Sequence, residues 1–179
     1  IYLGYSVKFV RNYTDVGHLT SDADSGEDKM IKGAQREGLT PQAIADKYIK
    51  IFEEDCIQMN LLPPDFKPRA TEYIAPMIDF IKILFAKGYA YQTEKAIYYD
   101  IIRCKNYNQL NHQKINLNQQ GAGKGEITDP EKKQPADFVL WFFKTGAHQN
   151  ALQTWDSPWG RGFPGWHLEC SVMAKELLG

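Results

Sequence analysis

Apolar positions recur at helical spacing in two long segments. In the first, residues 39–65, Thr40 and Pro41 stand where a helix cap and a first helical residue belong. Pro63 and Pro64 are expected to end this helix. Its apolar stripe consists of Ile44, Tyr48, Ile51, Phe52 and Met59. Cys56 lies near the stripe, so we expect a buried thiol there.

The second segment, residues 70–88, repeats the pattern and predicts another helix, with Gly88 as its C-terminal stop. Its apolar positions are Ile74, Met77, Ile78, Ile81, Leu84 and Phe85. The next residues, 89–101, alternate around polar positions and predict a β-hairpin with its turn near Thr93 to Lys95.

Alternation also appears near the start of the chain. Residues 5–16 are rich in β-branched and aromatic residues, and they predict a strand that runs into a polar turn at Asn12, Thr14 and Asp15. Further on, Pro135 is expected to open a short turn before an ordered apolar stretch. Its inward-facing side chains are expected to be Phe138, Leu140, Trp141 and Phe142.

Two polar segments superficially resemble ligand-binding loops. Residues 21–30 place Asp22 and Asp24 as in a calcium loop, but the glycine and the final glutamate of that pattern do not match. Residues 106–133 contain a glycine cluster around Lys124 but lack the ending of a phosphate-binding loop. Solvated surface loops are the favoured interpretation of both.

Composition indicates a globular protein of one domain or a little more, with 179 residues of which 43% are hydrophobic. The net charge of −1 argues against nucleic-acid binding through overall basicity, although a local basic face stays open. Three widely spaced cysteines do not form a disulfide framework, which favours a reducing, cytosolic compartment with two structural thiols and one undecided. No apolar run reaches the roughly 18 residues that a membrane span requires, so no membrane association is expected.

The closing segment, "PGWHLECSVMAKELLG", brings a thiol and an imidazole to the start of a predicted helix. A cysteine in the first turn is expected to have a depressed pKa, which would make Cys170 a nucleophile or a metal ligand. His167 lies three positions earlier and shares its helix face. Trp166 could form the wall of a pocket.

Three interpretations of this segment remain open from the residues alone. Cys170 could be a buried structural thiol. His167 and Glu169 match half of the zinc-deaminase signature, although its second half does not follow. Cys170 could also be one ligand of a zinc ion whose other ligands lie outside this chain.

The same segment closely resembles a motif of the cysteinyl-tRNA synthetases, which are class I aminoacyl-tRNA synthetases. "YLGYSVKFVRNYTDVGH", "RATEYIAPMIDFIKILFAKGYAY" and "KKQPADFVLWFF" are similar to further parts of that family, in the same order. The resemblance implies an α/β fold in which residues 1–20 and 161–179 belong to a Rossmann-like catalytic domain. Residues 21–160 would form a mostly helical connective insertion that carries a small β-hairpin.

The resemblance also implies a site and a reaction. Cys170 matches a zinc ligand, Trp166 matches a residue that lines the amino-acid pocket, and Thr14 matches a threonine beside the substrate. The family activates cysteine with ATP and magnesium to cysteinyl-adenylate and transfers it to tRNA(Cys). Because zinc prefers thiolate to hydroxyl, direct coordination would separate cysteine from serine. For His167 we expect only support of Cys170 from the outer shell of the site.

The family's HIGH-type and KMSKS-type motifs do not appear, so the catalytic residues stay unknown. We therefore expect a central fragment that is inactive by itself, with zinc and ATP sites that need other parts of the enzyme. Two alternatives remain. One is a fragment of a paralogous ligase that transfers cysteine to a small amino-sugar acceptor, and the other is a non-catalytic truncated module that binds RNA or a partner.

Overall fold

The computed structural model describes residues 2–17, 29–107, 109 and 129–179. Within these residues the helices are α1 (Lys29–Glu37), α2 (Pro41–Gln58), α3 (Ile74–Ala86) and α5 (Trp166–Leu178). The strands are β1 (Ala90–Gln92), β2 (Ala96–Tyr99), β3 (Phe138–Phe143) and β4 (Gly162–Pro164). Three short 3₁₀ helices span Ala70–Tyr73, Ile101–Arg103 and Gly146–His148.

The predicted hairpin is present and is part of a larger sheet. β1 and β2 pair antiparallel with Ala90 opposite Tyr99, and the turn between them is held by the Thr93 hydroxyl, which accepts hydrogen bonds from the backbone N–H groups of Lys95 and Ala96. β3 and β4 extend the pairing, so that the sheet has four antiparallel strands in the order β1-β2-β3-β4. The predicted fold class, a mixture of helices and strands, is therefore correct, but its β part exceeds a hairpin.

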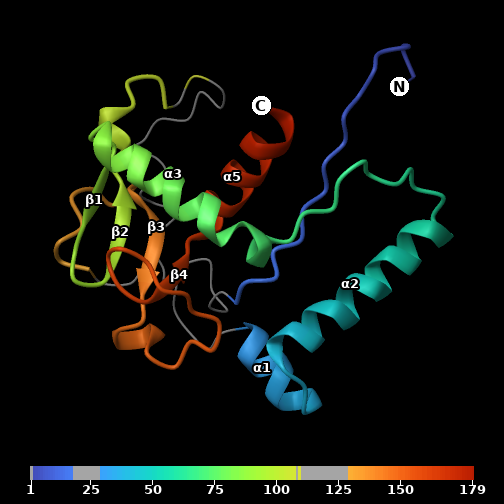
Figure 1. Cartoon of the computed structure of the whole chain (residues 1–179), viewed down its shortest axis with the longest axis horizontal. Helices are drawn as coiled ribbons and strands as arrows, with labels where there is room; N and C mark the ends of the chain where they lie inside the picture. Colours follow the sequence, from blue (N-terminus) through green and yellow to red (C-terminus); the bar gives the residue numbers. More distant parts are fainter. Residues whose placement is uncertain (1, 18–28, 108, 110–128) are drawn as a thin grey trace.

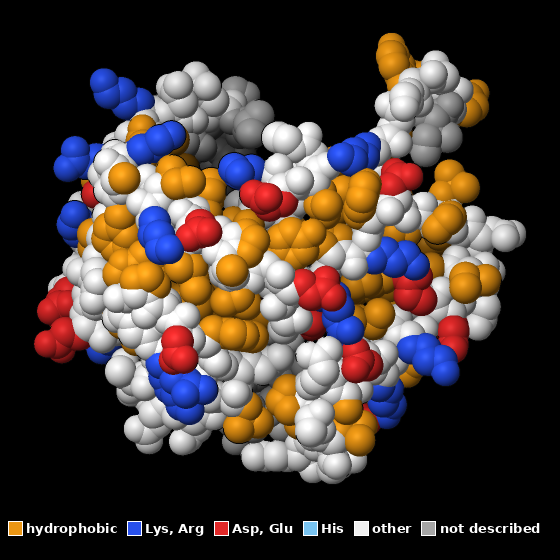
Figure 2. All heavy atoms as spheres, viewed as in Figure 1, with side chains coloured by type: hydrophobic (Ala, Val, Ile, Leu, Met, Phe, Trp, Pro, Cys, Tyr) orange, Lys and Arg blue, Asp and Glu red, His pale blue; other side chains and the backbone are white. Residues whose placement is uncertain are grey.

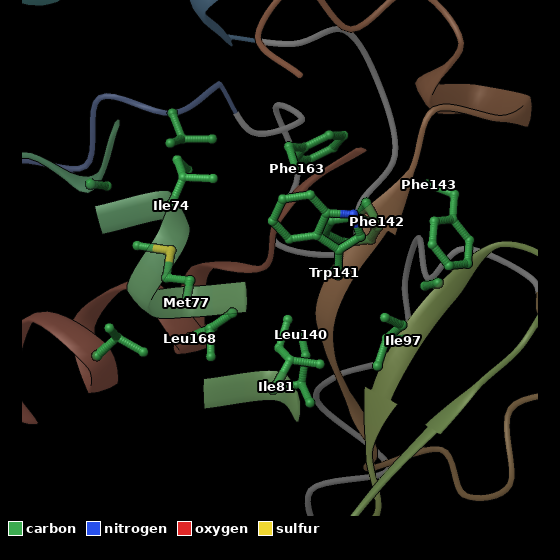
Figure 3. Packing of buried hydrophobic residues seen from close by; sticks show 14 of the residues in the cluster. Ile74, Met77, Ile81, Ile97, Leu140, Trp141, Phe142, Phe143, Phe163 and Leu168 are labelled. Atoms are coloured by element: carbon green, nitrogen blue, oxygen red, sulfur yellow. The ribbon is translucent and has the colours of Figure 1, made fainter. Parts of the chain in front are cut away.

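Helices α3 and α5 pack together against this sheet and enclose the main hydrophobic core (Figure 1). Figure 3 shows side chains from α3, β2, β3, β4 and α5 meeting in this core. Its fully buried members include Met77, Ile81, Ile97, Trp141, Leu168 and Val172. Of the inward-facing residues predicted on β3, Leu140, Trp141 and Phe142 are buried, whereas Phe138 is half-buried at the strand's start.

The segment predicted as a first strand is extended but makes only two isolated parallel bridges, Val10 with Phe66 and Tyr13 with Arg69. The backbone N–H of Arg11 donates to the Phe66 carbonyl at 3.1 Å, and that of Tyr13 to the Pro68 carbonyl at 2.9 Å. Because these bridges are parallel and α1 and α2 lie between the two segments in the chain, the connection is a parallel crossover, as in α/β folds.

Helix α2 begins as predicted and ends earlier than predicted. The Thr40 hydroxyl accepts a hydrogen bond from the Ala43 N–H at 3.2 Å, with Pro41 in the first turn. The helix ends at Gln58, and Asn60 then adopts a left-handed backbone with φ of 55°. The expectation that Pro63 and Pro64 end it was wrong, because the chain has already left the helix. Helix α1, which packs on α2, was not predicted.

The apolar stripe of α2 is largely exposed. Ile44 is buried against α1, but Tyr48 is 45% and Met59 70% exposed, and Ile51 and Phe52 are also exposed. Helix α2 lies away from the sheet in Figure 1, and Figure 2 shows hydrophobic side chains on the viewed surface among charged ones. Cys56 is buried as predicted.

Most of the two segments compared with calcium and phosphate loops lies in residues 18–28 and 110–128, outside the described part of the chain. The loop expected over residues 21–30 is wrong at its end, because Lys29 and Met30 begin α1. Just beyond residues 110–128, two buried carboxylates join the chain to the hairpin. Asp129 accepts hydrogen bonds from the hydroxyls of Thr93 and Tyr98 at 2.8 and 3.0 Å. Asp137 accepts from the Tyr91 hydroxyl at 2.7 Å and from the Ile101 N–H at 3.1 Å.

Candidate functional site

The closing helix begins where two glycines let it approach β3 closely. The Gly165 N–H donates to the Leu140 carbonyl at 2.9 Å. A Cβ atom on Gly165 would lie 2.1 Å from the Val139 carbonyl oxygen, and one on Gly162 would lie 1.9 Å from that of Phe142. Any larger residue would collide with the strand, so these glycines determine where α5 begins.

Helix α5 has a buried and an exposed face. Its buried residues are Leu168, Glu169, Val172 and Met173. Trp166 is 55% exposed, and His167 and Cys170 are exposed too. Because Trp166 and Cys170 are four positions apart, they lie one turn apart on the same side of the helix. The structure thus presents the predicted Trp166 and Cys170 on one surface.

The extended segment near the start of the chain passes beside this surface. The Asn12 side-chain N–H donates to the Cys170 sulfur at 3.7 Å, although the two residues are 158 positions apart. Sequence reasoning did not identify Asn12 as a site residue. We expected His167 to support Cys170 instead. The His167 ring packs against Phe138, with 4.9 Å between the ring centroids.

Thr14 lies on the same side of the extended segment as Asn12. Side chains alternate along extended backbone, and the neighbours on the other side are accounted for: Tyr13 donates to Glu53, and Asp15 pairs with Arg69. The Thr14 side chain is exposed. The alternation therefore directs Thr14 and Asn12 toward the side that faces α5.

The turn after Thr14 is tightly bonded. The Asp15 carboxylate, which is 2% exposed, accepts hydrogen bonds from Arg69 Nε at 2.9 Å and from the Thr71 N–H and hydroxyl at 2.9 and 2.7 Å. On its other side, the Gln153 amide donates to the Asp15 carbonyl at 2.9 Å and accepts from the Gly17 N–H at 2.8 Å.

The expected depression of the Cys170 pKa is wrong. Partial burial raises the pKa of the Cys170 thiol, and the Glu169 carboxylate raises it further, while the hydrogen bond from Asn12 acts in the opposite direction. The helix begins at Trp166, so Cys170 lies in its second turn, beyond the reach of most of the dipole effect. Although His167 is exposed as a residue, its ring packs against Phe138, and the resulting desolvation lowers the pKa of His167.

The zinc-deaminase interpretation is not supported by this geometry. His167 is exposed and Glu169 is completely buried, because residues two apart on a helix point in different directions. Enclosed in the core, the Glu169 carboxylate has no access to a water bound at the exposed His167.

Within the described ranges, no group of three or more histidine, cysteine or acidic side chains could hold a metal ion. Cys170 offers one accessible sulfur with an N–H donor beside it, which suits a single thiolate ligand of zinc but not a complete site. All three cysteines are free, with Cys56 buried and Cys104 half-buried. No helix in the described part of the chain is long and apolar enough to cross a bilayer.

Comparison with known proteins identifies close relatives of the whole chain. The chain is 47% identical to a cysteine–tRNA ligase of Treponema denticola over 99% of its length, and 46% identical to cysteine–tRNA ligase 1 of Burkholderia lata over 98%. It is 39% identical to a cysteine–tRNA ligase of Thermus thermophilus over its full length.

The match covers 36%, 37% and 36% of these three relatives, so the chain spans little more than a third of their length. The family described as tRNA synthetases class I (C) catalytic domain matches residues 1–179. Because this family matches the chain from end to end, the chain belongs to the class I tRNA synthetase (C) catalytic-domain family.

Proposed function

We propose that this chain is the part of a cysteine–tRNA ligase that holds the amino acid during activation. The observation that carries the proposal is the meeting of two distant segments. Asn12 and Thr14 on one segment and Trp166 and Cys170 on the other face a common surface, joined by the contact between Asn12 and Cys170. A pocket wall, a hydroxyl and a sulfur ligand there suit recognition of a small amino acid that carries a thiol.

The proposed reaction has two steps. A carboxylate oxygen of cysteine attacks the α-phosphorus of ATP, and the bond to the bridging oxygen of the β-phosphate breaks, which releases pyrophosphate with its magnesium. A ribose hydroxyl at the end of tRNA(Cys) then attacks the carbonyl carbon, its proton passes to a phosphate oxygen of the leaving AMP or to solvent, and the bond between that carbon and the AMP oxygen breaks. The contribution of this chain is to position the cysteine, since the described residues carry no complete ATP site.

Each proposed site residue has a separate task. Cys170 would hold zinc through its sulfur, and zinc bound there supplies a thiophilic Lewis acid that distinguishes the thiol of cysteine from the hydroxyl of serine. Asn12 orients the Cys170 sulfur through its N–H group. Trp166 would close one side of the pocket. The Thr14 hydroxyl would bond the amino or carboxylate group of the substrate.

We also propose the domain division that the family resemblance implies. Residues 1–20 and 161–179 would belong to the Rossmann-like catalytic domain, and residues 21–160 would form its connective insertion. The parallel crossover supports a catalytic-domain origin for the first segment. The three free cysteines are compatible with the cytoplasm, where charging of tRNA would take place.

The test is transfer of labelled cysteine to tRNA(Cys) by the complete reading frame that contains this chain, with the 179-residue chain as control. We expect charging by the complete protein and none by the chain alone. Cysteine-dependent pyrophosphate exchange without charging would instead point to a ligase with a small acceptor. Absence of both activities from the complete protein would refute the proposal, and a gel shift at two salt concentrations would then test RNA binding.

A further inference from the structure

The loop that precedes β4 is attached firmly to the start of the closing helix. Trp155 and Gly162 form an antiparallel bridge, in which each backbone N–H donates to the other residue's carbonyl, with nitrogen-to-oxygen distances of 2.7 and 3.0 Å. Three residues after Gly162, the chain enters α5 at Gly165. Any group fixed to this loop is therefore fixed relative to Trp166 and Cys170.

Gln153, which is half-buried in the same loop, bonds a distant segment through both ends of its amide. Its Nε2 donates to the Asp15 carbonyl oxygen at 2.9 Å, and its Oε1 accepts from the Gly17 N–H at 2.8 Å. A carbonyl can only accept and an N–H can only donate, so these partners determine the orientation of the amide. The side-chain amide thus makes the two hydrogen bonds with the turn that a peptide group of a neighbouring strand would make.

The turn that Gln153 holds is already constrained from the opposite direction. There the Asp15 carboxylate is bonded to Arg69 and Thr71. Thr14 immediately precedes this turn, and its backbone has little freedom once both sides of the turn are fixed. Removing the Gln153 amide would free the side of the turn that faces the loop before β4, while the bonds to Arg69 and Thr71 would stay intact.

We propose that Gln153 is a positioning residue for the amino-acid pocket, which sets the distance between Thr14 and the Trp166–Cys170 face of α5. The proposal rests on the proposed function for its kinetic consequence, but its structural consequence does not depend on that function. Gln153 was not recognised in the sequence, because its partners are 136 and 138 positions away.

The experiment compares three variants in the complete protein. Gln153→Ala removes both hydrogen bonds. Gln153→Glu keeps an acceptor for the Gly17 N–H and loses the donor to the Asp15 carbonyl. Gln149→Ala is the matched control, because Gln149 is an exposed glutamine four residues earlier on the same stretch of chain.

Two quantities are measured on each variant: hydrogen exchange of the Gly17 amide, and the KM and kcat of cysteine-dependent ATP–pyrophosphate exchange. For Gln153→Ala we expect Gly17 exchange to accelerate at least roughly tenfold, because its acceptor is lost. We expect the KM for cysteine to rise about tenfold, with the KM for ATP unchanged, since Thr14 would move relative to the bound amino acid. In Gln153→Glu the acceptor for Gly17 is kept while the new carboxylate oxygen repels the Asp15 carbonyl, so its Gly17 exchange should lie between wild type and Gln153→Ala. Gln149→Ala should behave as wild type.

The outcomes separate the two proposals. If wild-type protein shows no cysteine-dependent exchange, the proposed function fails, and accelerated Gly17 exchange in Gln153→Ala alone would still establish the hydrogen-bonded connection. If wild type is active and Gln153→Ala alters neither Gly17 exchange nor the KM for cysteine, the positioning role is wrong. A parallel rise in the KM for cysteine and for ATP would likewise overturn it, because that pattern indicates general loss of structure.

Discussion

At the scale of single residues, the position of α5 depends on the absence of a side chain at Gly165. Gly165→Ala would place a Cβ atom 2.1 Å from the Val139 oxygen, so the helix start or β3 must move. We expect a loss of about 1–3 kcal/mol in the free energy of unfolding, the usual cost of overpacking. Urea denaturation measures it.

Gly33→Ala is the matched control, because Gly33 lies within α1 and its Cβ atom would meet Ile44 at an ordinary 3.7 Å. Alanine is the better helix former, so this variant should be neutral or more stable by up to about 1 kcal/mol. Equal destabilisation by both variants would show that close packing at Gly165 is not what positions the helix.

A second prediction concerns the hydroxyl of Tyr91. It donates to the buried Asp137 carboxylate at 2.7 Å and accepts from the Lys133 N–H at 2.9 Å. Burial raises the pKa of Tyr91, and the bond to Asp137 raises it further. Tyr91→Phe should destabilise the protein by about 1–3 kcal/mol, because the bonded carboxylate loses a partner. Thermal unfolding tests this, and Tyr2→Phe, on a ring that is 98% exposed, should have no comparable effect.

The candidate site residues differ in how far the sequence alone could predict them. Thr14, Trp166 and Cys170 came from family resemblance, and their roles remain proposals. Asn12 could have been found by alternation, because it lies two positions before Thr14 on extended backbone. Gln153 left no local signal, since nothing in its neighbourhood indicates a partner more than a hundred residues away.

At the scale of elements, the pairing of α1 with α2 should be sensitive to acid. Glu37 bonds Lys47, Tyr48 and Arg36, and the bond from Lys47 contributes most to lowering the pKa of Glu37 from 4.5 to about 2. A carboxylate whose pKa is lower in the folded than in the unfolded state stabilises the fold at any pH above its unfolded-state pKa. This stabilisation is lost as the pH falls through its folded-state pKa. We therefore expect the contact to weaken progressively between pH 4.5 and 2.

Hydrogen exchange of residues 32–58 across this pH range provides the measurement. In Glu37→Gln the part of the acid-dependent loss that comes from this contact should be absent, because position 37 no longer titrates. The contributions of Asp46 and Glu53, whose pKa values are lowered by Arg69 and Lys67, should remain. An unchanged pH profile in that variant would mean that another group controls the stability of this helix pair.

Elements that depend on local chemistry were predicted well. The Thr40 cap, the helical periodicity of α3 and Gly88, whose φ is 73°, are all readable within a few residues. The pairing of β3 with β2 and β4 and the parallel bridges to Phe66 and Arg69 are long-range, and no local pattern specifies them. Helix α1 was missed because its first residues, Lys29 and Met30, lie in the segment 21–30, whose acidic composition indicates a loop.

At the scale of the whole molecule, two distant segments meet at one surface, and Cys170 is its proposed metal ligand. The apolar stripe of α2 shows the limit of prediction at this scale. Its periodicity indicates a helix face correctly but does not reveal that Tyr48 and Met59 are exposed. Burial depends on what covers a face, which the spacing of residues does not encode.

The most direct measurement is cysteine-dependent ATP–pyrophosphate exchange, with zinc content determined in parallel, for the complete protein and its Cys170→Ser variant. Outer-shell partners of a metal ligand are typically worth about 10–100-fold in affinity or activity, so loss of the ligand itself should cost at least about 100-fold. We expect exchange and bound zinc to fall together in Cys170→Ser, while Cys104→Ser retains both. Full exchange and full zinc content in Cys170→Ser would contradict the assignment of Cys170, and with it the proposed amino-acid pocket.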